Sequence, residues 1–183
     1  MAEVEHLAPD PDREVLTGSV EEARRILAFE VEEIDRQYQL TERVLRLGVV
    51  VLAGVIAVLG LMPGTSLMSG VVATRSIAAA VLLNVAGVAR AAFVLEARGG
   101  VGMVAFGPQI HALSDRMEEA DWCRSDLDLS LLRSYAVSSN VNQSTLGAIA
   151  SGRMVSLRLI SVGTFVYLLT FAYIFEWGIH HVG

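Results

Sequence analysis

The stretch LISVGTFVYLLTFAYIF, residues 159–175, decides the fold class because it carries no charge along its whole length. A charge-free apolar run of this length is typical of a helix that crosses a lipid bilayer, so we predict a membrane span over 157–178. The residues beyond it, 179–183, then form a tail outside the membrane. Aromatic side chains gather toward the C-terminal end of the span, as they do at a membrane interface: Tyr167, Tyr173 and Trp177.

Two further apolar segments precede this span and form a predicted hairpin over 47–96. The first, over about 47–62, is about 24 Å long as a helix, a little shorter than a hydrocarbon core of about 30 Å. The second, over about 77–95, is interrupted only by Asn84 and Arg90, and its helix could begin earlier because the residues before it are also mostly apolar.

The composition agrees with this pattern, because 53% of the residues are hydrophobic and 19% are charged. A water-soluble domain has about 45–50% apolar and about 25% charged residues. The rival interpretation is a soluble bundle with three buried helices, but apolar runs this long favour the bilayer. The predicted fold class is therefore all-α: an integral membrane protein with three transmembrane helices and long cytoplasmic helical extensions.

The arginines predict the orientation, since all 14 basic residues are arginines and they are unevenly distributed. Six precede the first predicted span and six lie from Arg98 to Arg158, whereas only Arg75 lies in the hairpin loop. By the positive-inside rule, the N-terminus and the segment 97–156 are cytoplasmic and the C-terminus is outside. We therefore expect a multi-pass protein of the cell (inner) membrane, without a cleavable signal peptide because the start of the chain is acidic and polar.

The N-terminal region divides into a predicted flexible acidic tail, 1–18, and a cytoplasmic helix, 19–46, that continues into the first span. Ser19 and Glu22 have the spacing of a capping box at the start of this helix. Two interpretations of its apolar face stay open: it packs on the chain's own second cytoplasmic helix, or it forms a coiled-coil seam between copies. That face contains Leu27, Val31, Ile34, Tyr38, Thr41 and Leu45.

The cytoplasmic segment 97–156 contains a glycine-rich connector and then a predicted helix that begins near Leu113. Within this segment, residues 134–152 carry no charge but include many small and amide side chains. Such a face could line a vestibule or an ion path, but we favour subunit contacts or a kinked linker, because uncharged polar helix faces usually contact protein. The candidate residues here are Asn140, Asn142 and Thr145.

Three residues of the second span are candidates for helix packing or for a pore lining. Asn84 and Gly87 share one helix face, where a small residue lets another helix approach and the amide can find a partner. Arg90 lies near the cytoplasmic end, where it could snorkel to the headgroups, pair with Glu96, or attract anions at a pore mouth.

The sequence predicts neither an enzyme nor a metal or cofactor site. It has no serine–histidine–aspartate set, no paired acids within the spans, and no histidine and cysteine cluster with metal-ligand spacing. The net charge of −6 argues against binding to nucleic acid.

Two functional classes remain. The first, which the sequence favours, is an oligomeric ion channel or pore gated through its cytoplasmic helices, with membrane lipid, copies of the same chain and ions as its partners. The second is a non-conducting scaffold or anchor subunit of a larger membrane complex.

The layout of a cytoplasmic helix, a tight two-span hairpin and a further cytoplasmic helical segment resembles the small prokaryotic SLATT-like membrane effectors of nucleotide-linked antiviral systems. The chain also looks like a group of haloarchaeal multi-span membrane proteins in which a motif of the type Leu132-Arg133-Ser134-Tyr135, with Asn140, precedes a last span. The third span departs from the two-span plan. The resemblance implies homo-oligomers that disrupt or permeabilise the inner membrane when triggered, and it assigns no functional residue.

Overall fold

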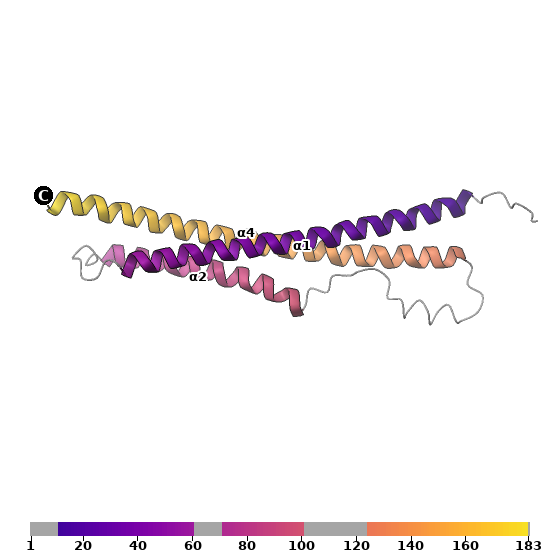
Figure 1. The fold of residues 1–183 in the computed structure, drawn as a ribbon, viewed down its shortest axis with the longest axis horizontal. Helices are drawn as coiled ribbons and strands as arrows, with labels where there is room; N and C mark the ends of the chain where they lie inside the picture. Colours follow the sequence, from indigo (N-terminus) through magenta and orange to yellow (C-terminus); the bar gives the residue numbers. More distant parts are fainter. Residues whose placement is uncertain (1–10, 61–70, 101–123, 183) are drawn as a thin grey trace, which may run out of the picture. The chain divides into compact units, whose positions relative to one another are not determined.

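The computed structural model describes residues 11–60, 71–100 and 124–182, and this part of the chain is entirely helical (Figure 1). It consists of α1 (Pro11–Gly60), α2 (Val71–Gly100) and α4 (Arg124–Val182). The helices contain 50, 30 and 59 residues, whereas about 20 residues suffice to cross a bilayer. All three are long and apolar enough to span a membrane by length and composition, so the all-α class with three candidate spans agrees with the sequence.

The chain forms two units, which we describe separately. Unit 1 comprises Met1–Asp35 and Met103–Leu146, and unit 2 comprises Arg36–Gly102 and Gly147–Gly183. In the described residues, unit 1 therefore contains the first halves of α1 and α4. Unit 2 contains the second halves of these helices together with all of α2.

Buried positions recur every seven residues along each helix, which is the spacing by which helices pack side by side at a small crossing angle. Of the predicted apolar face of α1, four residues are buried, namely Leu27, Ile34, Tyr38 and Thr41, while Val31 and Leu45 are half-buried. The corresponding buried residues of α2 are Ala73, Ala80, Gly87 and Val94. Those of α4 are Asn142, Ile149, Ser156, Gly163 and Thr170.

In unit 2, α1 and α4 run in the same direction and α2 runs against them. Gln37 of α1 contacts Arg153 of α4, and Gly48 farther along α1 lies against Ile160 farther along α4. The order reverses for α2, because Val94 lies against Gly152 of α4, whereas Asn84, ten residues earlier, lies against Gly163. This is the arrangement that three successive crossings of one bilayer require.

The start of α1 differs from the prediction, because the helix begins at Pro11 and thus includes residues 11–18 of the expected flexible tail. Proline suits a first helical turn, where its missing N–H has no helical partner to lose. Ser19 consequently lies inside the helix, where its hydroxyl donates to the Val15 carbonyl at 2.8 Å. Ser19 does not cap the start of the helix, and the capping-box prediction is wrong.

Two further boundaries differ from the prediction. Helix α2 begins at Val71, so Arg75 is helical rather than part of a loop. Helix α4 passes without a break through 134–152, where we considered a kinked linker. Small and polar residues of low helix propensity are tolerated there because tertiary contacts override propensity. The predicted connector beyond Gly100 and the predicted helix start near Leu113 lie outside the described residues.

Candidate functional site

The face of α2 that contains Asn84 and Gly87, here called the stripe, is buried against protein. Ala80 and Ala91 are fully buried, Asn84 is 1% exposed and Gly87 is also buried. Ala80 and Gly87 are seven residues apart, as are Asn84 and Ala91, so this spacing places all four residues on the same face of α2. It lies against the second half of α4.

The Asn84 amide is satisfied mainly by its own helix. Its Nδ2 donates to the Ala80 carbonyl at 2.9 Å. The Thr164 hydroxyl lies 3.5 Å from the Asn84 Oδ1, but it has a single proton and is 2.7 Å from the Ile160 carbonyl. Because the shorter contact is within the normal hydrogen-bond range and the longer one is at its limit, the proton goes to Ile160. Asn84 therefore joins the helices chiefly by packing.

Gly163 makes this packing feasible. A Cβ atom placed there would lie 2.5 Å from the Asn84 Nδ2 and 2.9 Å from the Ala80 carbonyl oxygen. The backbone oxygen cannot rotate away as a side chain can, so a larger residue at this position requires the helices to separate. Gly163 is not among the residues predicted from sequence, although its seven-residue spacing from Ser156 and Thr170 is a detectable signal.

A second close contact joins all three helices of unit 2 around Ile160. A Cβ on Gly48 of α1 would approach Ile160 Cδ1 to 2.8 Å and Val88 Cγ2 to 2.7 Å. A Cβ on Gly87 of α2 would approach Ile160 Cγ1 to 2.7 Å and the Ser156 carbonyl oxygen to 3.0 Å. One branched side chain thus fills the space left by two glycines, as is common where membrane helices pack closely.

In unit 1 the central polar residue is Glu30 of α1, which is 6% exposed. Its Oε1 accepts hydrogen bonds from the Ser139 hydroxyl of α4, at 2.5 Å, and from the Gln143 amide, at 3.2 Å. Its Oε2 is buried with no hydrogen-bond partner. This network agrees with the interpretation that the apolar face of α1 packs on another helix of the same chain, which here is the first part of α4. Glu30 is not among the residues predicted from sequence, although it is an acid next to the apolar face of α1.

The candidate residues of α4 divide between buried and exposed positions. Asn142 is fully buried in unit 1 and has a polar contact. Thr145 is half-buried and donates to the Val141 carbonyl at 2.9 Å, whereas Asn140 is exposed. Asn142 can therefore fix how the helices pack, while Asn140 is available to another molecule.

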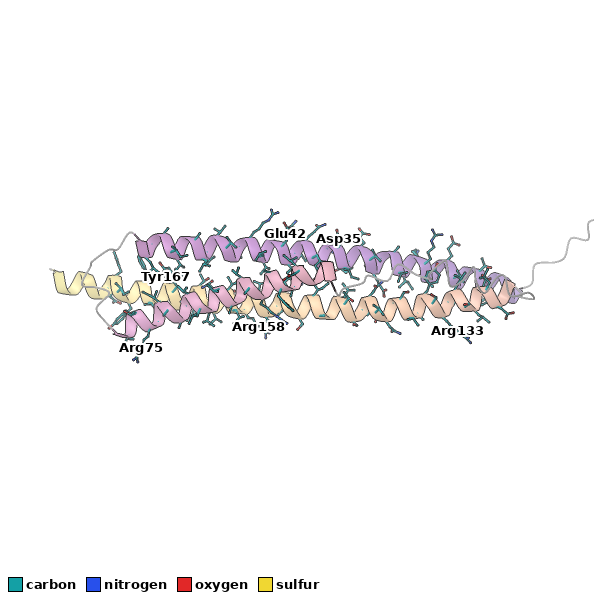
Figure 2. All side chains as sticks on the ribbon, turned by 90° about the horizontal axis from the view of Figure 1, so that it is seen from below. Asp35, Glu42, Arg75, Arg133, Arg158 and Tyr167 are labelled. Atoms are coloured by element: carbon teal, nitrogen blue, oxygen red, sulfur yellow. The ribbon has the colours of Figure 1, made fainter. Side chains whose placement is uncertain are left out.

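The arginines of unit 2 are mostly on its surface. Arg90 is exposed, with its guanidinium carbon 5.8 Å from the centre of the Phe93 ring. Among the described residues no ion pair joins Arg90 to Glu96, because residues six apart lie on different faces of a helix. Arg75 and Arg158 are also exposed, and Figure 2 shows both projecting away from the neighbouring helices.

Within the residues that the structure describes, no group of three or more histidine, cysteine or acidic side chains could hold a metal ion. Comparisons of the chain with protein-family models, curated proteins and solved structures found no match. In the described residues, the helices of unit 2 meet through close glycine contacts, and those of unit 1 are joined by hydrogen bonds to the buried carboxylate of Glu30.

Proposed function

We propose that the chain crosses a membrane three times, once with each of α1, α2 and α4. The apolar surface of unit 2 carries this proposal, because large apolar side chains are exposed on all three helices. Val50 is 67% exposed, Leu82 68% and Phe165 61%. In water, an exposed side chain of this kind forgoes about 1.5–3 kcal/mol of burial free energy. A surface with so many of them is suited to lipid.

The proposed orientation has the first halves of α1 and α4 in the cytoplasm. The parallel course of α1 and α4 in unit 2 supports it, since both helices then enter the bilayer from the same side. Arginines concentrate where the apolar segments begin on that side, as the positive-inside rule requires of a cytoplasmic boundary. They are Arg43, Arg46, Arg90, Arg153 and Arg158.

For the function itself, the geometry favours a non-conducting scaffold that anchors a partner to the membrane. Three of the six residues proposed from sequence to line a pore are occupied by packing within one chain. Asn84 and Gly87 are buried against α4, and Asn142 is buried in unit 1. Side chains buried inside a protomer do not line a water-filled path between protomers. This burial weakens the main evidence from sequence for a channel.

An oligomeric channel is the second candidate, and one observation favours it. Asn140 and Ser144 are exposed, one turn apart, on an uncharged stretch of α4. Protein interfaces are depleted of charge at their centres, so this face is suited to contact with another copy of the chain.

Two measurements on the purified chain separate these functions. Flotation with liposomes that resists alkaline carbonate tests membrane insertion, and failure to float would refute the three-span proposal. Ion flux from the same liposomes then tests conduction. The scaffold predicts flux equal to that of empty liposomes, whereas flux above that level, together with a nanodisc particle of five or more chains, would support the channel instead.

A further inference from the structure

A groove of about 390 Å³ lies between α1 and α4 in unit 2. It straddles the level at which the apolar part of α1 begins, at Leu47. Two arginines and four aliphatic side chains line it, and none of the six is acidic: Leu40, Arg43, Val44, Leu47, Arg153 and Leu157.

The two arginines keep their positive charge available. Arg153 is half-buried and donates to the Gln37 amide oxygen, which is a neutral partner. A guanidinium has five N–H donors, so this bond orients Arg153 and leaves further donors for a ligand. Among the described residues, the nearby carboxylate of Glu42 is bonded to Arg46 rather than to either arginine of the groove.

The aliphatic lining extends from these charges toward the predicted span. Val44 and Leu47 follow Arg43 within about one helical turn, and Leu157 follows Arg153 by about one turn on α4. Because α1 and α4 run in the same direction here, both apolar segments lie on the same side of the arginines. Apart from Leu40, which precedes Arg43, the lining is therefore cationic at one end and apolar at the other, and this direction follows the axis of the proposed spanning helices.

We propose that this groove binds an anionic glycerophospholipid, with the headgroup phosphate between Arg43 and Arg153. The part of an acyl chain nearest the headgroup then lies along Val44, Leu47 and Leu157. Charge complementarity favours an anion, since the site has two positive charges and no acid. The apolar lining favours a lipid over a free anion. Basic pockets between membrane helices on the cytoplasmic side bind such headgroups by the same chemistry. This inference depends on the membrane insertion proposed above.

The experiment measures binding of phosphatidylglycerol and phosphatidylcholine to the full chain in detergent by native mass spectrometry. We expect phosphatidylglycerol to bind with a stoichiometry of one and in clear preference to phosphatidylcholine. Since an arginine near an anionic surface contributes about a fivefold effect, Arg43→Gln or Arg153→Gln should each weaken binding about fivefold. The double variant should weaken it about thirtyfold. Equal binding of the two lipids would overturn the proposal.

The matched control is Arg158→Gln, which removes the same charge from α4 outside the groove and should change lipid binding less than twofold. Equal loss in the control would show only diffuse attraction and would overturn the site. Leu157→Asn should weaken phosphatidylglycerol binding without changing the affinity for inorganic phosphate, because both arginines stay in place. If millimolar phosphate displaces the lipid completely, the site holds a free anion instead. Circular dichroism checks that each variant folds.

Liposome flotation distinguishes the two proposals. If the chain does not float, the membrane proposal fails and the lipid site fails with it. If the chain floats and resists carbonate but shows no preference for the anionic lipid, only the lipid site is refuted.

Discussion

The contact between α2 and α4 in unit 2 differs in chemistry from the contact between α1 and α4 in unit 1. In unit 2 the buried amide of Asn84 bonds to the carbonyl of its own helix, and the helices meet through glycines. In unit 1 the buried carboxylate of Glu30 bonds to side chains of the other helix. The first contact depends on close approach, and the second on hydrogen bonds across the interface.

This difference matches the solvent that we propose for each unit. In lipid, helices gain little by hiding apolar surface from each other, so small residues and close packing hold them together. In water, apolar burial supplies the driving force, and a polar group inside the contact must find a partner. Each contact therefore predicts a different sensitivity to mutation.

The largest effect should come from filling the close contact in unit 2. Gly163→Leu should destabilise the protein by about 3 kcal/mol, because its side chain meets the backbone oxygen of Ala80. Gly54→Leu is the matched control, since a Cβ there has no neighbouring atom within 4 Å. Thermal unfolding in detergent measures both. Equal stability of the two variants would show that the contact is not close.

The next effect concerns the hydrogen bonds of unit 1. Glu30→Ala leaves Ser139 and Gln143 without their buried acceptor, at a cost of about 1–3 kcal/mol. Amide hydrogen exchange near residue 143 should then accelerate at least about fivefold. Glu30→Gln keeps an acceptor oxygen and should preserve protection, and the exposed Glu32→Ala is the control. Unchanged exchange in Glu30→Ala would show that the network contributes nothing.

A smaller effect is expected at Asn84. Asn84→Leu keeps the volume of the side chain and removes an amide that bonds chiefly within α2. Interhelical polar contacts in membranes average about 0.6 kcal/mol, so the loss should stay below about 1 kcal/mol in unfolding by detergent titration. A loss as large as that of Gly163→Leu would mean that the amide, and not close packing, holds α2 to α4.

The smallest effect is expected for the surface ion pair of Arg25 and Glu22, which are 3.1 Å apart. Their side chains are 80% and 54% exposed, so water and salt screen the attraction. Arg25→Gln should not measurably change thermal unfolding or hydrogen exchange. A clear loss of stability would indicate that Arg25 has a further role in unit 1.

Much of the fold could be predicted from local sequence. The apolar runs identified the candidate spans, and the spacing of Leu27, Ile34 and Thr41 identified the buried face of α1. The start of α1 was wrong because the capping pattern of Ser19 and Glu22 also occurs inside helices. The uninterrupted course of α4 through its polar stretch was missed because propensity scales describe isolated helices and not packed ones.

By itself, the sequence determined that the described part of the chain is helical, that three segments are apolar enough for a bilayer, and which faces of α1 and α2 are buried. These properties are sums over neighbouring residues, so hydrophobicity and period suffice to predict them. Only the tertiary structure decided that Glu30 meets Ser139, 109 residues away, that Asn84 packs on Gly163, and that Arg43 and Arg153 share a groove. Those pairs depend on the rotation and longitudinal register of distant helices, which no local pattern specifies.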